Sequence, residues 1–210
     1  MLALQITLLV ATALAAMANW SSRVRPNARL EEISKPLTTV LVIALALVSG
    51  APGAQIAVAT AALVLCLAGD VALLDRIDRF IVGLAAFLVG HLVFIILFAQ
   101  YGMSHLAWGG VALILVATLV ATVGRVIVHA AGAGDATLKL PVAAYLTVIS
   151  AMAVCGWSTG RPWVIAGTTL FVVSDAVLGW RQFVREESWM ALVVMVTYHA
   201  AIGSLALSLW

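Results

Sequence analysis

Long apolar stretches follow one another along almost the whole chain, and they constrain its fold more than any other feature. A stretch of about 20 apolar residues can cross the hydrocarbon core of a bilayer as a helix. Short breaks that contain charged residues, glycine or proline separate these stretches. The predicted spans are residues 2–20, 36–50, 55–74, 80–99, 106–127, 140–157, 163–180 and 189–209. The sequence therefore predicts an all-α fold, a polytopic membrane bundle of eight transmembrane helices, in which the second span is the shortest.

The composition excludes most other classes of protein. Of the 210 residues, 64% are hydrophobic and 10% are charged, whereas soluble domains carry about 25% charged residues. So few charges cannot cover a water-facing surface, which excludes a soluble enzyme. A net charge of +2 offers no basic face for nucleic acid. Because the connections between spans are short, residues 1–210 are expected to form a single transmembrane domain.

The distribution of cations predicts how the bundle is oriented in the membrane. Cytoplasmic connections carry an excess of Lys and Arg. Of the 11 Lys and Arg residues, all except Arg161 fall in alternate connections, at residues 21–35, 75–79, 125–139 and 181–188. These connections are therefore expected inside and both termini outside. In a bacterium, the chain would lie in the inner (plasma) membrane.

Rare polar residues recur at about half the chain length, which predicts an internal repeat. Asp70 and Asp175 are 105 residues apart, and each lies six residues before the arginine that ends its span. The lysine that opens the second span has a counterpart at the start of the sixth. Four spans in each half give both halves the same orientation, so residues 1–104 and 105–210 would form a parallel repeat.

Asp70 and Asp175 are the strongest candidates for catalysis. Six residues of helix place each carboxyl about 9 Å inside the cytoplasmic boundary. An acid at that depth is costly unless it is paired, solvated or protonated, so it suggests function. The alternative is a neutral aspartic acid that hydrogen-bonds a neighbouring helix. If the two acids face each other across an apolar cavity and share a proton, one can serve as acid and the other as base.

Four further polar side chains within the spans are candidates for substrate binding. Tyr145 reaches the same depth of about 9 Å, where its hydroxyl could bind a carboxyl, a substrate oxygen or a backbone carbonyl. Lys35 could reach the lipid headgroups or pair with a lipid phosphate. His91 and His199 lie about 18 Å deep, either as contacts between helices or as proton carriers. No His-x-x-x-His or Cys-x-x-Cys pair is present, so no metal or cofactor is expected.

Six short motifs follow one another in a fixed order along the chain. They are Lys35–Thr39, Gly69–Leu74, Gly83–His91, Ala144-Tyr145, Ser174-Asp175 and Tyr198–Ala201. In this order and spacing they resemble the YhhN-like family of eight-span membrane proteins, whose characterised members are lysoplasmalogenases. One departure is Ile202, where many members carry glutamine.

The resemblance implies cleavage of the vinyl ether bond of a lysoplasmalogen, to give a fatty aldehyde and a glycerophospho-ethanolamine or -choline. A lysophospholipid and the bilayer are then the expected partners, and Tyr198 joins the residues expected to bind substrate. A protonated aspartic acid would deliver a proton to the β-carbon of the vinyl ether. An ionised aspartate would stabilise the resulting oxocarbenium ion and deprotonate the attacking water.

Two other functions use the same residues. A proton-coupled transporter or flippase also has buried acids and paired repeats, although no predicted span is broken at its middle by glycine or proline. A metal-dependent lipid amidase would take His91, His199 and an aspartate as ligands. Turnover in detergent micelles separates an enzyme from a transporter, and elemental analysis tests for zinc. No span carries a clear Gly-x-x-x-Gly seam, which leaves the oligomeric state open.

Overall fold

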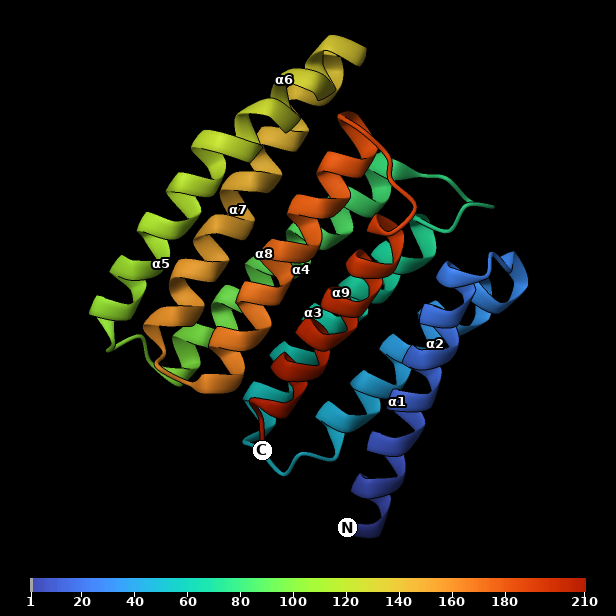
Figure 1. The fold of residues 1–210 in the computed structure, drawn as a ribbon. Coiled ribbons are helices and arrows are strands. Elements are labelled where there is room, and N and C mark those ends of the chain that lie inside the picture. The colour runs from blue at the N-terminus through green and yellow to red at the C-terminus, as the bar shows by residue number, and fades with distance from the viewer. Residues whose placement is uncertain (1) are drawn as a thin grey trace.

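Long helices run through the computed structural model, which describes residues 2–210 (Figure 1). They are α1 (Leu2–Val24), α2 (Ala28–Leu47), α3 (Gly53–Ala72), α4 (Phe80–Tyr101), α5 (Leu106–Leu119), α6 (Arg125–Gly134), α7 (Lys139–Ser158), α8 (Pro162–Phe183) and α9 (Met190–Leu207). A π-helical turn, Val120–Gly124, joins α5 and α6 into one continuous helix, and a 3₁₀ turn, Ala136–Leu138, precedes α7. Residues 2–210 contain no strand, and the all-α prediction is confirmed.

Seven of these helices are long and apolar enough to cross a bilayer, as in a multi-pass integral membrane protein. They are α1, α3, α4, the continuous α5–α6 helix, α7 with its 3₁₀ turn, α8 and α9. Helix α2 is the exception among the eight predicted spans. Its first half holds Arg29, Glu31, Glu32 and Lys35, so this helix carries too many charges to count as an apolar span.

Helix α2 begins earlier than the sequence predicts, because Asn27 caps it. The side-chain oxygen of Asn27 accepts a hydrogen bond from the backbone N–H of Leu30, at 3.1 Å. The predicted start of the second span at residue 36 is therefore wrong, since Pro36 lies inside α2. The predicted connection at residues 21–35 shortens to residues 25–27, and most of its charges lie on helices.

The fifth predicted span is also longer than expected. It continues through the π-helical turn into α6, so Arg125 lies within a helix and not in a connection. Ile127 and Ala131, one helical turn apart, are both buried and form a small core with Val142 of α7. Burial of this i, i+4 pair stabilises the extension.

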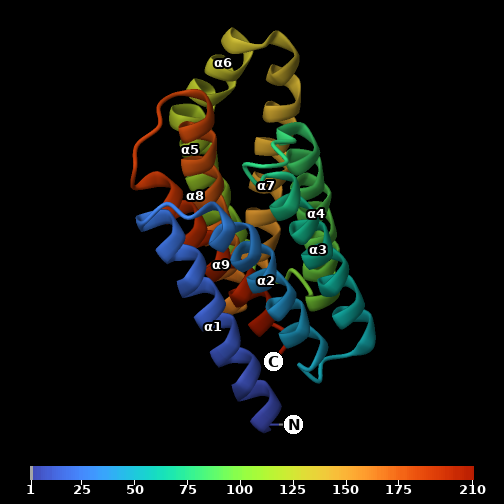
Figure 2. The ribbon, with the colours of Figure 1, turned by 90° about the vertical axis from the view of Figure 1, so that its right-hand side faces the viewer.

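The two chain ends lie at one end of the bundle, and four connections lie at the other (Figure 1). These connections join α1 to α2, α3 to α4, α6 to α7 and α8 to α9. The expected excess of Lys and Arg lies at this end of the bundle, which is called the cationic end below. Helix α9 runs through the middle of the bundle, where it packs against α8, α2, α1 and α3 (Figure 2).

Helices α3 and α4 approach each other closely near the cationic end. A Cβ atom at Gly69 would lie 2.5 Å from the ring of Phe87, so only glycine allows this approach. The deeper core is aromatic, with Phe94, Phe98 and Phe171 fully buried. This packing fixes the ends of α3, α8 and α9 around the cavity described next.

Candidate active site

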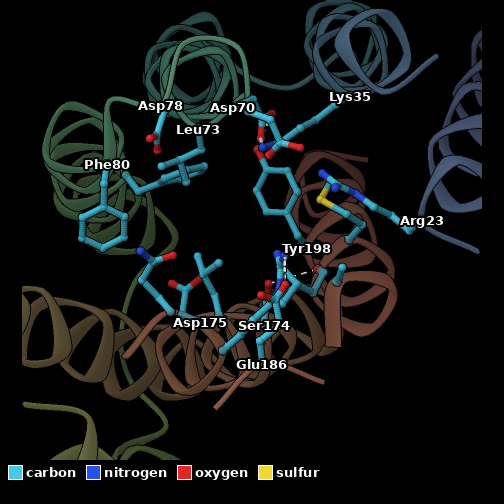
Figure 3. A pocket seen from close by; sticks show the side chains of 18 residues that line it. Arg23, Lys35, Asp70, Leu73, Asp78, Phe80, Ser174, Asp175, Glu186 and Tyr198 are labelled. Atoms are coloured by element: carbon cyan, nitrogen blue, oxygen red, sulfur yellow. Dashed lines mark hydrogen bonds and ion pairs between the residues drawn. The ribbon is translucent and has the colours of Figure 1, made fainter. Parts of the chain in front are cut away.

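A cavity of about 190 Å³ lies near the cationic end, between α2, α3, α4, α8 and α9 (Figure 3). Residues of the α3–α4 and α8–α9 connections form part of its wall. Acidic, basic and hydroxyl side chains line it together. They are Arg23, Lys35, Asp70, Asp75, Asp78, Ser174, Asp175, Arg181, Glu186 and Tyr198. The size and polar wall of this cavity suit a polar or charged group.

Asp70 is buried in the cavity wall among groups that stabilise a negative charge. Its Oδ2 accepts a hydrogen bond from Thr39 Oγ1 at 2.5 Å and another from the Tyr198 hydroxyl at 2.7 Å. The Lys35 Nζ lies 3.9 Å from Oδ1. Hydrogen bonds to a charged acceptor and a neighbouring cation both favour the ionised carboxylate. Helices α2 and α9 thus hold this carboxyl in one orientation.

Asp175 has a less polar environment on α8. Its Oδ2 accepts one hydrogen bond, from the Tyr145 hydroxyl at 2.5 Å. The carboxyl lines the polar cavity and also an adjoining apolar pocket of about 40 Å³, whose walls include Leu84, Val142 and Tyr145. Asp175 therefore lies where a polar compartment meets an apolar one.

The two aspartates project into the cavity from opposite sides (Figure 3). Neither carboxyl has the other among its hydrogen-bond partners, which are Thr39 and Tyr198 for Asp70 and Tyr145 for Asp175. The expected direct sharing of a proton is therefore not part of this structure. The arrangement leaves space between the acids for a group that both can contact.

Comparison with known proteins identifies the family of this chain. Residues 30–209 match the YhhN family. The chain belongs to that family. The resemblance seen in the sequence motifs is thereby confirmed, and it covers the aspartates and all of the cavity wall except Arg23.

This YhhN protein is similar to several curated lysoplasmalogenases. It is 35% identical to rat lysoplasmalogenase TMEM86B over 135 residues, which are 62% of this chain and 52% of the rat protein. It is 34% identical to the human protein over 142 residues, 67% of this chain and 58% of the human one. A lysoplasmalogenase of Mycobacterium bovis is 29% identical over 124 residues, 58% of this chain and 48% of that protein. The chain thus spans about half the length of the curated relatives it matches. No solved structure matches this YhhN protein.

The two deep histidines of this YhhN protein lie outside the cavity wall. His91 is fully buried between the rings of Tyr145 and Phe171, whose centroids lie 5.5 and 5.0 Å from its own. His199 Nδ1 accepts a hydrogen bond from the indole N–H of Trp20 at 3.1 Å. The structure thus brings Lys35 and Tyr198 to the polar cavity and Tyr145 to the apolar pocket, but neither histidine. Within residues 2–210, no group of three or more His, Cys, Asp or Glu side chains could hold a metal ion.

Sequence reasoning missed two hydroxyl side chains of the site. Thr39 lies four residues after Lys35, so both project from the same face of α2 toward Asp70. That spacing was the available signal. Ser174 lines the cavity beside Asp175, and its hydroxyl donates a hydrogen bond to the backbone carbonyl of α9 at residue 194.

Two ion pairs stand at the outer edge of the cavity. Arg23 of α1 pairs with the buried carboxylate of Glu31. Arg181 donates from Nε and Nη2 to Glu186 Oε1, at 2.9 and 2.5 Å. These pairs place guanidinium groups near the opening, where a phosphate group would be attracted.

Proposed function

We propose that this YhhN protein is a membrane-embedded lysolipid hydrolase that cleaves the vinyl ether bond of a lysoplasmalogen. Its products would be a fatty aldehyde and a glycerophospho-ethanolamine or -choline. The observation that carries the proposal is the pair of aspartates on opposite sides of a polar cavity, one of them at the junction with an apolar pocket. The names of the similar rat, human and mycobacterial proteins support the same reaction.

The two compartments fit the two parts of a lysolipid. The polar cavity would take the glycerophosphate. Lys35 can bind it because, within residues 2–210, its ammonium pairs with Asp70 alone, at 3.9 Å. The adjoining apolar pocket takes the first carbons of the hydrocarbon chain. A vinyl ether lies where glycerol meets that chain, so the bond to be cleaved would lie beside Asp175.

The surroundings of the two acids support different roles for them. Asp175, with one hydrogen-bond donor and an apolar pocket beside it, would carry the proton and give it to the β-carbon of the vinyl ether. Asp70, with two donors and Lys35 beside it, would remain ionised and stabilise the oxocarbenium ion.

Water completes the reaction. Asp70 takes a proton from a water molecule that attacks the oxocarbenium carbon, and the resulting hemiacetal collapses to aldehyde and alcohol. Water in the cavity would then return the proton from Asp70 to Asp175, which restores both acids. One water is consumed for each bond cleaved, and no covalent nucleophile is needed. Tyr198 and Tyr145 hold the two carboxyls in place, and the His91 ring packs against Tyr145 and positions its hydroxyl.

Helix packing supports a parallel repeat of two four-helix halves within one domain. Helices α1, α2, α3 and α4 of the first half correspond to α5–α6, α7, α8 and α9 of the second. In the first half α1 packs on α2 and α3 packs on α4, and in the second half α5 packs on α7 and α8 packs on α9. Between the halves, α2 packs on α9 as α7 packs on α4. In each half an aspartate accepts a hydrogen bond from the preceding helix, from Thr39 in one and Tyr145 in the other. We place the cationic end in the cytoplasm and both termini outside.

The proposal is tested by turnover of the purified protein in detergent micelles, with aldehyde and free fatty acid as separate readouts. A lysoplasmalogen should yield aldehyde, and an acyl lysolipid should yield no fatty acid. Asp70→Asn and Asp175→Asn should each abolish aldehyde release and elute from a sizing column like the wild type. Asp135→Asn, in the exposed α6–α7 connection, is the matched control. Wild-type turnover in either cavity variant, or transport across vesicles without product, would overturn the proposal.

A further inference from the structure

A long groove runs along the outer face of the bundle, between the α5–α6 helix and α7, the two helices at one edge in Figure 1. Its volume is about 510 Å³, which exceeds that of the cavity between the aspartates. From Leu113 to Arg125 it follows 12 residues of helix, a length of about 18 Å. Most of its wall is apolar, and this face would meet the lipid chains of the bilayer.

The groove is charged only near the cationic end. Arg125 and His129, one turn apart on α6, line it there together with Lys139 at the start of α7. All three side chains are exposed. A polar end with three basic groups and an apolar length of about 18 Å match a phosphate headgroup joined to a hydrocarbon chain.

A small pocket, called here the neck, lies between this groove and Asp175. The neck, of about 20 Å³, shares Val120, Gly124, Leu146 and Ser150 with the groove, and Asp175 forms its inner wall. It passes the π-helical turn Val120–Gly124, and such turns often mark functional sites.

Gly124 and Leu146 face each other across the neck, and the gap between them is too narrow for an alkyl chain until the Leu146 side chain turns away. A Cβ atom at Gly124 would lie 3.4 Å from Leu146 Cδ1, so one added carbon fits and a longer side chain fills the neck. Leu146 forms the other wall and is partly exposed. Rotation of its side chain would widen the passage at little cost, because exposed rotamers change within nanoseconds.

We propose that this groove is the lateral entry site for the substrate, a single-chain lysophospholipid that reaches Asp175 from the bilayer. The phosphate binds Arg125, His129 and Lys139 at the membrane surface while the chain lies in the groove. The chain then passes between Gly124 and Leu146. The inference rests on the proposed function for the identity of the lipid, but the groove and its neck are independent of any chemistry at the aspartates.

Photocrosslinking tests the site without any hydrolysis. The probe is an alkyl-ether lysophospholipid with a diazirine on its chain, which lacks the vinyl ether and cannot be cleaved. Its adducts should map to α5 and α7 along the groove, and an unlabelled single-chain lysolipid should displace it. Adducts confined to other helices would overturn the entry site even if the protein hydrolyses lysoplasmalogen. Equal displacement by a two-chain phosphatidylglycerol would also overturn it, since the groove would then hold a bilayer lipid.

Substitution at the neck tests the passage. Gly124→Leu should lower kcat/KM for a long-chain lysoplasmalogen by about tenfold, the order expected when two chain methylenes lose a buried place. A short, water-soluble vinyl ether should be cleaved within about twofold of the wild-type rate. Gly110→Leu is the matched control, because a side chain there meets open space on the same helix.

A second pair of variants keeps the test usable if leucine disturbs the π-helical turn. Ser150→Trp closes the neck from α7, and Leu140→Trp adds the same ring at a position that is 77% exposed. The first variant should lower kcat/KM for the long-chain lysoplasmalogen more than for the short vinyl ether, and the second should change neither. Equal effects of both on long and short substrates would mean that no chain passes the neck.

Discussion

Replacing Tyr198 by phenylalanine removes one oxygen atom from the site and little else. The Tyr198 hydroxyl donates to Asp70 Oδ2 at 2.7 Å, and the side chain is 4% exposed. Its ring packs against Phe87, Phe171 and His199, contacts that phenylalanine can keep. After the change, Asp70 Oδ2 retains only the hydrogen bond from Thr39, so the substitution isolates a single contact to the carboxylate.

The size of the effect follows from the charge on the acceptor. A hydrogen bond to a charged group contributes about 1.5–3 kcal/mol, whereas a neutral one contributes about 1 kcal/mol. If Asp70 is the ionised carboxylate that stabilises the transition state, Tyr198→Phe should lower kcat/KM by about ten- to a hundredfold. The assay is the initial rate of aldehyde release from lysoplasmalogen in micelles.

Tyr101→Phe is the matched control, because it removes a hydroxyl that contacts Ser208 at 3.1 Å, at the other end of the bundle. It should keep kcat/KM within about twofold of the wild type. Equal activity of Tyr198→Phe and the wild type would show that this hydrogen bond does not support a catalytic carboxylate. Equal losses in both variants would assign the effect to folding.

Two further predictions concern stability. Gly69→Ala should destabilise the protein by about 1–3 kcal/mol, because the new Cβ would overlap the Phe87 ring. Thermal unfolding in detergent measures this change, with Gly110→Ala as the control. An unchanged Tm for Gly69→Ala would contradict the packing. Hydrogen bonds from the Thr137 hydroxyl and backbone N–H hold the pKa of Asp135 below its ordinary value. The α6–α7 connection is therefore fully stabilised above about pH 4 and loses that stabilisation as the pH falls through the lowered pKa. Protection of residues 135–138 against hydrogen exchange, taken relative to the intrinsic rate at each pH, should fall on acidification in the wild type but not in Asp135→Ala. An equal fall in both would exclude the carboxyl as the cause.

The sequence identified the acids of the site and offered Tyr145 as a partner of a carboxyl, but it did not identify Thr39 as a partner of Asp70. Asp70 and Asp175 are visible because a carboxyl in an apolar stretch is costly, whatever the fold around it. Thr39 gives only the weak signal of its spacing from Lys35, since a hydroxyl within a helix most often bonds its own backbone, as Thr38 does to the carbonyl of Ser34. Only the packing of α2 against α3 directs Thr39 to Asp70.

The histidines also show that the sequence does not give the direction of a side chain. Counting residues along a helix gives the depth of His91 and His199 in the membrane, because the rise per residue is constant. It does not give the direction in which each ring points, which depends on how neighbouring helices pack. His91 packs between Tyr145 and Phe171, and His199 accepts a hydrogen bond from Trp20, so both lie away from the cavity.

The sequence by itself determined the all-α class, seven of the eight spans that it predicted, and the rare buried acids. Each of these depends on local composition alone, because lipid requires long apolar stretches and makes a buried charge costly. Helix ends were less certain, as the early start of α2 at its asparagine cap shows. Tertiary structure alone decided which polar side chains meet, where the polar cavity joins an apolar pocket, and that an outer groove lies beside a small pocket that reaches Asp175. Such contacts join residues far apart along the chain, and they exist only when several helices pack at particular rotations and distances.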